Sequence, residues 1–115
     1  MSKIQEVDGV KLLAAEVDGQ EAAGLRVGMD KLREKLPSGV IVLGSGGDGK
    51  ASLCVAVTKD LVASIKAGDI VKQLAPIVGG GGGGRPDMAM AGGKNPENIG
   101  EAIAKAPDVV KSLRG

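Results

Sequence analysis

Six consecutive glycines, Gly79 to Gly84, constrain this chain more than any other stretch of its sequence. Glycine has no side chain to bury, and it loses more conformational freedom on folding than any other residue. Such a run supplies backbone that can take positive φ and approach a ligand or another backbone closely. Arg85 follows directly, then Pro86 and Asp87 as a stiff turn.

Two interpretations of the run are open: a flexible linker or an ordered, ligand-binding loop. Linkers of this kind commonly mix glycine with serine, but the run contains no serine. Apolar periodic segments also flank it closely on both sides. We therefore expect an ordered loop, with Gly79 and Gly80 ending the preceding helix. If the backbone amides of Gly82 to Gly84 face a ligand, we expect at least one of these glycines to take positive φ.

The composition excludes several kinds of site. The chain has no Phe, Tyr, Trp or His, so its core is aliphatic and no base can stack on an aromatic ring. Without histidine and with one cysteine, a zinc site and a disulfide are both excluded, and Cys54 reads as a small buried hydrophobe. We expect no metal and no cofactor in this chain.

Charge and hydropathy narrow the class of protein further. The net charge of +1 produces no global positive field, although a local basic patch remains possible. No apolar run is long enough to span a membrane, and the N-terminus has no signal-peptide pattern. We expect one globular domain over residues 1–115, in the cytoplasm and without a membrane partner.

The apolar pattern predicts an α/β (α+β) fold, in which helices pack on a small mixed sheet that contains a β-hairpin. The expected strands are Gly9–Val17, Val40–Leu43, Ala51–Thr58 (paired with its predecessor as a hairpin) and Met88–Ala91. The expected helical segments start at Ala22, at Lys59, and at the expected caps Asp69 and Asn95. We expect Pro76 to kink the third segment or end it early, and Pro107 to break the last.

The hairpin connection, Gly44 to Lys50, contains two nucleotide-binding patterns at once. It satisfies both G-x-G-x-x-G and G-x-x-x-x-G-K. Both patterns need a helix to follow, because the N-terminal amides of that helix hold the phosphate. A strand is predicted instead, and Ala51 stands where a magnesium-binding hydroxyl belongs. We interpret this segment as a turn without nucleotide affinity.

Lys66 to Pro96 resembles the C-terminal part of alanyl-tRNA synthetases, with its KAGD helix start, APIVGG turn and GGGRPDMAQAGG segment. The resemblance extends over Val7 to Arg114. This chain has Met90 where that family commonly has glutamine. The module also resembles the domain attached to DHH phosphoesterases, which carries GGGH where this chain has GGGR.

The resemblance implies a non-catalytic tRNA-binding module of an alanine-tRNA ligase that works with other domains of the parent enzyme in aminoacylation and editing. It carries the family motif onto Gly82, Gly83, Gly84, Arg85, Pro86, Asp87, Gly92 and Gly93. Lys66, Lys72 and Lys94 add positive charge beside these positions. The implied partner is alanine-specific tRNA.

Two other functions stay open. The chain could be an oligomerisation or protein-interaction module, which its small net charge suits. It could also be the substrate-binding domain of a DHH-type phosphoesterase, although Arg85 replaces the histidine of that family. A purely structural role for the glycine run, with Arg85 paired to Asp87, is the remaining interpretation.

Overall fold

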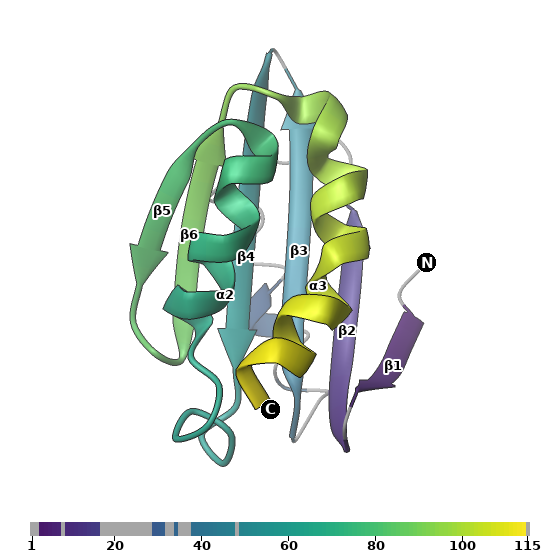
Figure 1. Cartoon of the computed structure of the whole chain (residues 1–115), viewed down its shortest axis with the longest axis vertical. Coiled ribbons are helices and arrows are strands. Elements are labelled where there is room, and N and C mark those ends of the chain that lie inside the picture. Colours follow the sequence, from purple (N-terminus) through teal and green to yellow (C-terminus); the bar gives the residue numbers. More distant parts are fainter. Residues whose placement is uncertain are drawn as a thin grey trace.

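The computed structural model describes residues 3–7, 9–16, 29–31, 34, 38–47 and 49–114. These residues form a six-stranded sheet in the order β1-β2-β3-β4-β6-β5 (Figure 1). Only the β2–β3 pair is parallel, and the other four pairs are antiparallel. The expected mixed sheet with helices packed on it is therefore confirmed.

The strands follow the chain in three hairpins. They are β1 Lys3–Val7, β2 Val10–Glu16, β3 Val40–Gly47, β4 Lys50–Val57, β5 Gly81–Gly84 and β6 Met88–Gly93. Strand β5 joins the sheet beyond β6, so the chain crosses from β4 to the sheet edge and then returns between them.

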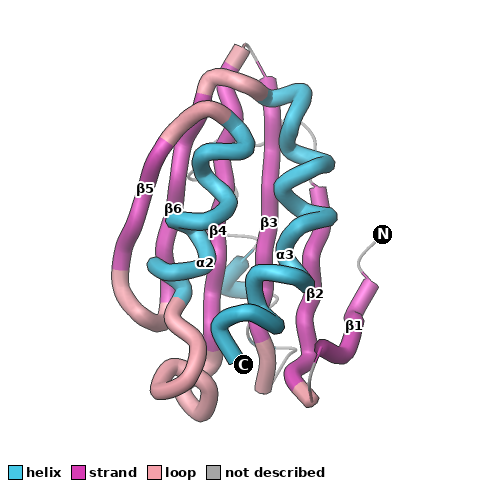
Figure 2. The backbone as a smooth tube through the Cα atoms, in the orientation of Figure 1, coloured by secondary structure: helices cyan, strands magenta, loops and turns pink. Residues whose placement is uncertain are grey.

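The helices of the second half cover one face of the sheet. They are α2 Ala67–Leu74, the 3₁₀ turn η1 Ala75–Val78, the 3₁₀ turn η2 Pro96–Asn98 and α3 Ile99–Arg114. Helix α2 packs on β4, β5 and β6, and α3 packs beside it on β2 and β3 (Figure 2). None of the described helices is long and apolar enough to cross a membrane.

Both faces of strands β3 and β4 are buried, and their side chains alternate between the two faces with a period of two. Leu53, Val55 and Val57 of β4 join the larger core with α2 and α3. Cys54 and Ala56 face the other way, into a smaller cluster with Met29. The burial of Cys54 agrees with its interpretation as a small hydrophobe. This two-sided burial explains why the strands read as nearly continuous apolar runs.

The structure departs from the expected strands at two places. Strand β1 precedes the segment that we expected to be first, because its five residues, KIQEV, carry too few apolar side chains to predict a strand. Gly44 to Gly47 belong to β3 rather than to a turn. The hairpin itself is confirmed, with Val42 opposite Val55.

The helix boundaries also differ from the pattern. Helix α2 begins at Ala67, two residues before the expected cap Asp69, and Asn95 makes no side-chain cap hydrogen bond. Helix α2 ends early, at Leu74, as expected. Pro76 lies in the 3₁₀ turn η1 that follows the helix. Pro107 does not break α3, which runs through it to Arg114. Proline costs one backbone hydrogen bond there, and burial of Ala106, Val109 and Val110 offsets that loss.

The helix expected between Ala22 and Leu36 lies mostly outside the described residues. Within them, Met29, Asp30, Lys31 and Glu34 are helical. Met29 is fully buried.

The glycine run is a strand rather than a loop, which is the main correction to the sequence interpretation. Gly81 to Gly84 form β5 and pair with Gly92 to Ala89 of β6. None of Gly82, Gly83 and Gly84 has positive φ, so that expectation was wrong. Positive φ falls instead at Gly79, whose φ of 74° ends η1.

Gly79 and Gly80 end the preceding helix, as predicted. Gly79 N–H donates to the Pro76 carbonyl at 3.1 Å and Gly80 N–H to the Ala75 carbonyl at 3.1 Å. This pair of bonds is the Schellman arrangement, which satisfies carbonyls at the end of a helix.

Alternate glycines of the run lie so close to β6 that a side chain cannot fit. A Cβ at Gly82 would collide with the Met90 carbonyl oxygen and come within 2.5 Å of Ala91 Cα. At Gly84 it would come within 2.8 Å of Ala89 Cα. At Gly81 and Gly83 it would meet nothing within 4 Å.

A small polar network fastens the start of β3 to the end of β4. Ser38 Oγ and Thr58 Oγ1 each donate to a carboxylate oxygen of Asp60, and Gly39 N–H donates to Thr58 Oγ1 at 3.0 Å. These hydroxyl bonds, Ser38 first, hold the pKa of Asp60 below its ordinary value of 3.8.

The alternation in β5 predicts unequal effects of alanine. We expect Gly82→Ala and Gly84→Ala to destabilise the fold by about 1–3 kcal/mol, because β5 must move away from β6. Gly81→Ala and Gly83→Ala should be neutral or stabilising by about 0.4–1 kcal/mol, since they reduce unfolded-chain entropy only. Urea denaturation of the four variants measures this, and equal effects at all four positions would contradict it.

Asp60 predicts an acid-dependent part of the stability. Because its folded pKa is lowered, the stabilisation is fully present above pH 3.8 and is lost as the pH falls through the folded pKa. Asp60→Asn should melt below the wild type at neutral pH, with the difference shrinking below pH 3.8. Asp108→Asn on α3 is the control, and a difference in melting temperature that does not change with pH would disprove the prediction.

Candidate nucleic-acid interface

Arg85 stands in the tight turn that joins β5 to β6. Its N–H donates to the Met88 carbonyl at 2.9 Å, and Pro86 and Asp87 form the turn between them. The sheet and α2 hold this turn, because Pro86 O accepts from Ala67 N–H at 2.8 Å and Asp87 O from Val57 N–H at 2.9 Å. The exposed Arg85 side chain therefore projects from a fixed backbone.

The outer edge of β5 presents bare backbone. The Arg85–Met88 hydrogen bond sets the antiparallel alternation, so Gly83 and Gly81 bond to β6. The N–H and C=O groups of Gly82 and Gly84 consequently point away from β6, to the sheet edge. They repeat every two residues, about 6.6–6.8 Å apart along the strand.

Two of the predicted lysines lie on α2 beside this edge: Lys66 caps the start of the helix and Lys72 is in its last turn. Lys66, Lys72, Gly84 and Pro86 line a notch of about 170 Å³, together with Gly68 and Asp69. Lys66 and Lys72 are exposed. Gly68 lies beside Gly84, since a Cβ there would be in van der Waals contact with the Gly84 carbonyl oxygen at 3.4 Å. The notch thus combines outward backbone groups with two positive charges and one negative charge.

The remaining predicted residues lie at the opposite end of β5. Gly92 pairs with Gly81, and Gly92, Gly93 and Lys94 line a second hollow, of about 420 Å³. Lys50 joins them from the β3–β4 hairpin. The sequence did not assign this lysine to the candidate interface, because Lys50 belongs to the Gly44–Lys50 segment, whose pattern is typical of nucleotide binding.

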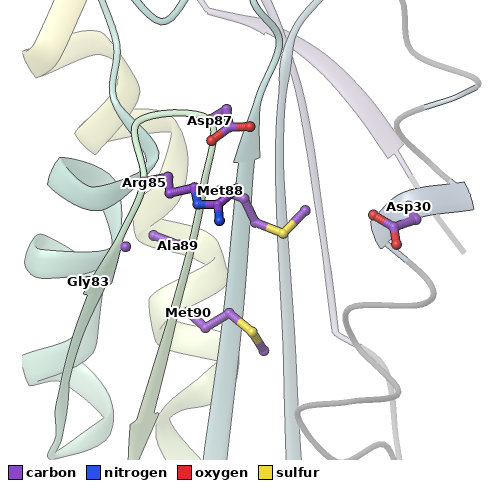
Figure 3. A pocket seen from close by; sticks show the side chains of 8 residues that line it. Asp30, Gly83, Arg85, Asp87, Met88, Ala89 and Met90 are labelled. Carbon is purple, nitrogen blue, oxygen red and sulfur yellow. The ribbon is translucent and has the colours of Figure 1, made fainter.

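A third hollow, of about 360 Å³, lies on the face of the sheet opposite α2, beside Arg85. Met88 and Met90 of β6 point into it on the same side, toward Asp30, and the Arg85 side chain extends toward Met88 (Figure 3). Gly83 and Asp87 also line it. The sequence could not place Asp30 here, since it lies more than fifty positions from Arg85 along the chain.

The glycines of the nucleotide-binding patterns serve packing instead. A Cβ at Gly44 would come within 2.8 Å of Ile99 Cγ2, and one at Gly46 within 2.8 Å of Pro96 Cβ. Gly44 and Gly46 therefore make room for the start of α3 on β3. Strand β4 begins at Lys50, so no helix starts directly after this segment, as both nucleotide-binding patterns require.

Proteins of known sequence that resemble this chain are alanine–tRNA ligases. That of Bacillus subtilis is 52% identical over 98% of the chain, and that of Pelotomaculum thermopropionicum is 51% identical over 97%. The chain spans 13% of the length of each.

Solved structures resemble the fold. The C-Ala domain of the Aquifex aeolicus alanyl-tRNA synthetase superposes with a TM-score of 0.86 at 27% identity, covering 98% of this chain and 99% of that one. A DHH-domain member of the s1p family of ribosomal proteins shares the fold, with a TM-score of 0.59 at 19% identity over 99% of this chain and 28% of that one. The DHHA1 domain family matches residues 9–112. The chain therefore belongs to the DHHA1 domain family.

Proposed function

We propose that this chain is the tRNA-binding C-terminal module of an alanine–tRNA ligase. Its similarity to the C-Ala domain over the whole chain supports this origin. In this proposal the module acts in the cytoplasm, where it holds alanine-specific tRNA for the aminoacylation and editing sites on other domains of the parent enzyme.

The observation that carries the proposal is the glycine edge strand β5 with positive side chains around it. An edge without side chains lets a sugar–phosphate backbone approach the outward N–H groups of Gly82 and Gly84, and N–H groups at the edge of a sheet can bind anions. Lys66 and Lys72 flank one end of the strand and Lys94 and Lys50 the other. The predicted residues thus form two clusters that one RNA strand along β5 can join.

Arg85 has a separate role in this arrangement. The fixed turn presents its guanidinium at the end of the glycine edge, where it can bind a phosphate through two parallel hydrogen bonds. The neighbouring carboxylates of Asp69 and Asp87 lower the positive charge around this site, so that anions are attracted mainly at the lysine and arginine side chains. RNA binding therefore depends on local charge rather than on the net charge of +1.

An oligomerisation module is the alternative with structural support. The outward groups of β5 could pair with β5 of a second copy, as exposed edge strands do. Sedimentation with and without tRNA separates the two functions. Self-association of the free chain that tRNA does not alter would favour oligomerisation over RNA binding.

Arg85→Ala should weaken tRNA binding by about 1.5–3 kcal/mol, the value of a charge-assisted contact, while the free energy of unfolding changes by about 0.5 kcal/mol or less. Filter binding at several salt concentrations and urea denaturation measure the two quantities. A variant that binds normally but unfolds far more easily would show that Arg85 is structural.

Lys66→Ala and Lys72→Ala should each reduce the salt dependence of tRNA binding, by about 0.7–0.9 in the slope of log K against log salt for each lost phosphate contact. Lys105→Ala is the matched control, because Lys105 is exposed on α3 over the other half of the sheet. Equal slopes for all three variants would argue against the α2 notch as a phosphate site.

A further inference from the structure

We propose that the hollow behind β5 and β6 receives one unstacked nucleobase of the bound RNA, on a floor of methionine rather than aromatic side chains. This inference rests on the proposed RNA-binding function and adds a second kind of contact to it. The residues that carry it are Met88, Met90, Gly83, Arg85, Asp87 and Asp30.

The floor of the hollow suits a flat apolar ring. Met88 and Met90 occupy alternate positions of β6, so both side chains leave the same face of the sheet, as Figure 3 shows. Both are half-buried, packed on the cluster around Leu43 and Cys54, with part of each side chain open to the hollow. Their flexible, polarizable thioethers make favourable contacts with aromatic rings.

Gly83 provides the room above this floor. It lies directly opposite Met90 in the β5–β6 pairing, and a Cβ built there would meet no atom within 4 Å. The space of about 360 Å³ lies in the range of small-molecule sites. A planar ring can therefore lie across Met90 against bare backbone.

The polar groups of the hollow disfavour a phosphate and favour a base. Asp30 and Asp87 bring two negative charges against the single positive charge of Arg85, so an anion would be repelled. A nucleobase is neutral, and its edge carries both N–H donors and oxygen or nitrogen acceptors. The carboxylates accept from the donors of the base, while the guanidinium of Arg85 stays available for a phosphate beside the hollow.

The hollow also adjoins the proposed phosphate-binding edge. Gly83, Gly84 and Arg85 line it while belonging to, or directly following, β5. A strand of RNA whose phosphates follow the outer edge of β5 can thus turn one base around the end of the strand. Unpaired loop bases are the part of an RNA that can be unstacked in this way.

Methyl NMR tests the inference directly. The chain has four methionines, and [¹³C-methyl]methionine labelling gives one signal for each. Met88→Leu and Met90→Leu, which roughly conserve volume, assign the two signals of the hollow. The probes are a tRNA transcript and a short single-stranded RNA, with an abasic oligomer of the same length as the control.

We expect both RNAs to move the Met88 and Met90 methyl signals through the ring current of the base, while the signal of the buried Met29 stays in place. The abasic oligomer should move the amide signals of Gly82 and Gly84 but neither methyl. If base-bearing RNA moves the glycine amides and leaves both methyls unchanged, the hollow holds no base. If neither RNA moves the glycine amides, the proposed function itself fails.

A charge-neutralising variant gives an independent test. Asp30→Asn should bind base-bearing RNA about tenfold more weakly, because one acceptor to the base loses its charge. Its affinity for the abasic oligomer should not fall. Asp108→Asn on α3 makes the same change in net charge away from the hollow and should bind like the wild type. Unchanged or tighter binding of base-bearing RNA by Asp30→Asn would overturn the proposal.

Discussion

Strand β5 can lie against β6 only because alternate positions of the glycine run carry no side chain. A Cβ at Gly80, Gly82 or Gly84 would strike the backbone of β6, and at Gly80 the obstacle is the Gly92 carbonyl oxygen. The same closeness recurs where η1 meets β6, since a Cβ at Gly93 would strike the Val78 carbonyl. Backbone–backbone contact thus fixes the edge strand, the turn of Arg85 and the start of α2 relative to one another.

This constraint explains which parts of the fold the sequence could predict. Strands β3 and β4 were predictable, because burial on both faces leaves an unmistakable apolar run. Strand β5 was not, because glycine is depleted in strands and has no side-chain alternation to reveal a register. At Pro107 the sequence predicts a helix break that the structure does not contain. The local propensity of proline predicts this break, and the tertiary packing of Val109 and Val110 overrides it.

The candidate site could likewise be predicted only in part from the sequence. The sequence motif named Arg85 and the neighbouring glycines, because glycine and arginine in this order carry chemistry that can be read locally. It could not show that the backbone N–H and C=O groups of Gly82 and Gly84 point to the sheet edge while Gly83 pairs with Met90. Both features depend on the strand register that the hydrogen bond from Arg85 to Met88 sets. Nor could the motif bring Asp30 to the hollow, because that contact depends on where the neighbouring buried Met29 packs against the sheet.

An exposed edge strand normally invites pairing with another chain, and β5 carries few of the usual protections. Glycine nevertheless weakens such pairing, because cross-strand side-chain contacts supply much of the stability of a sheet and β5 can offer none. Lys66 and Lys72 near one end and Lys50 and Lys94 near the other further oppose a second copy with the same charges. An anionic ligand that binds through backbone amides and lysine side chains is favoured by both the missing side chains and the positive charge. The missing side chains let it approach the backbone closely, and the lysines attract its negative charge. The edge therefore favours a polyanion over a second β-strand, and a sugar–phosphate backbone is a polyanion that repeats along a line as β5 does.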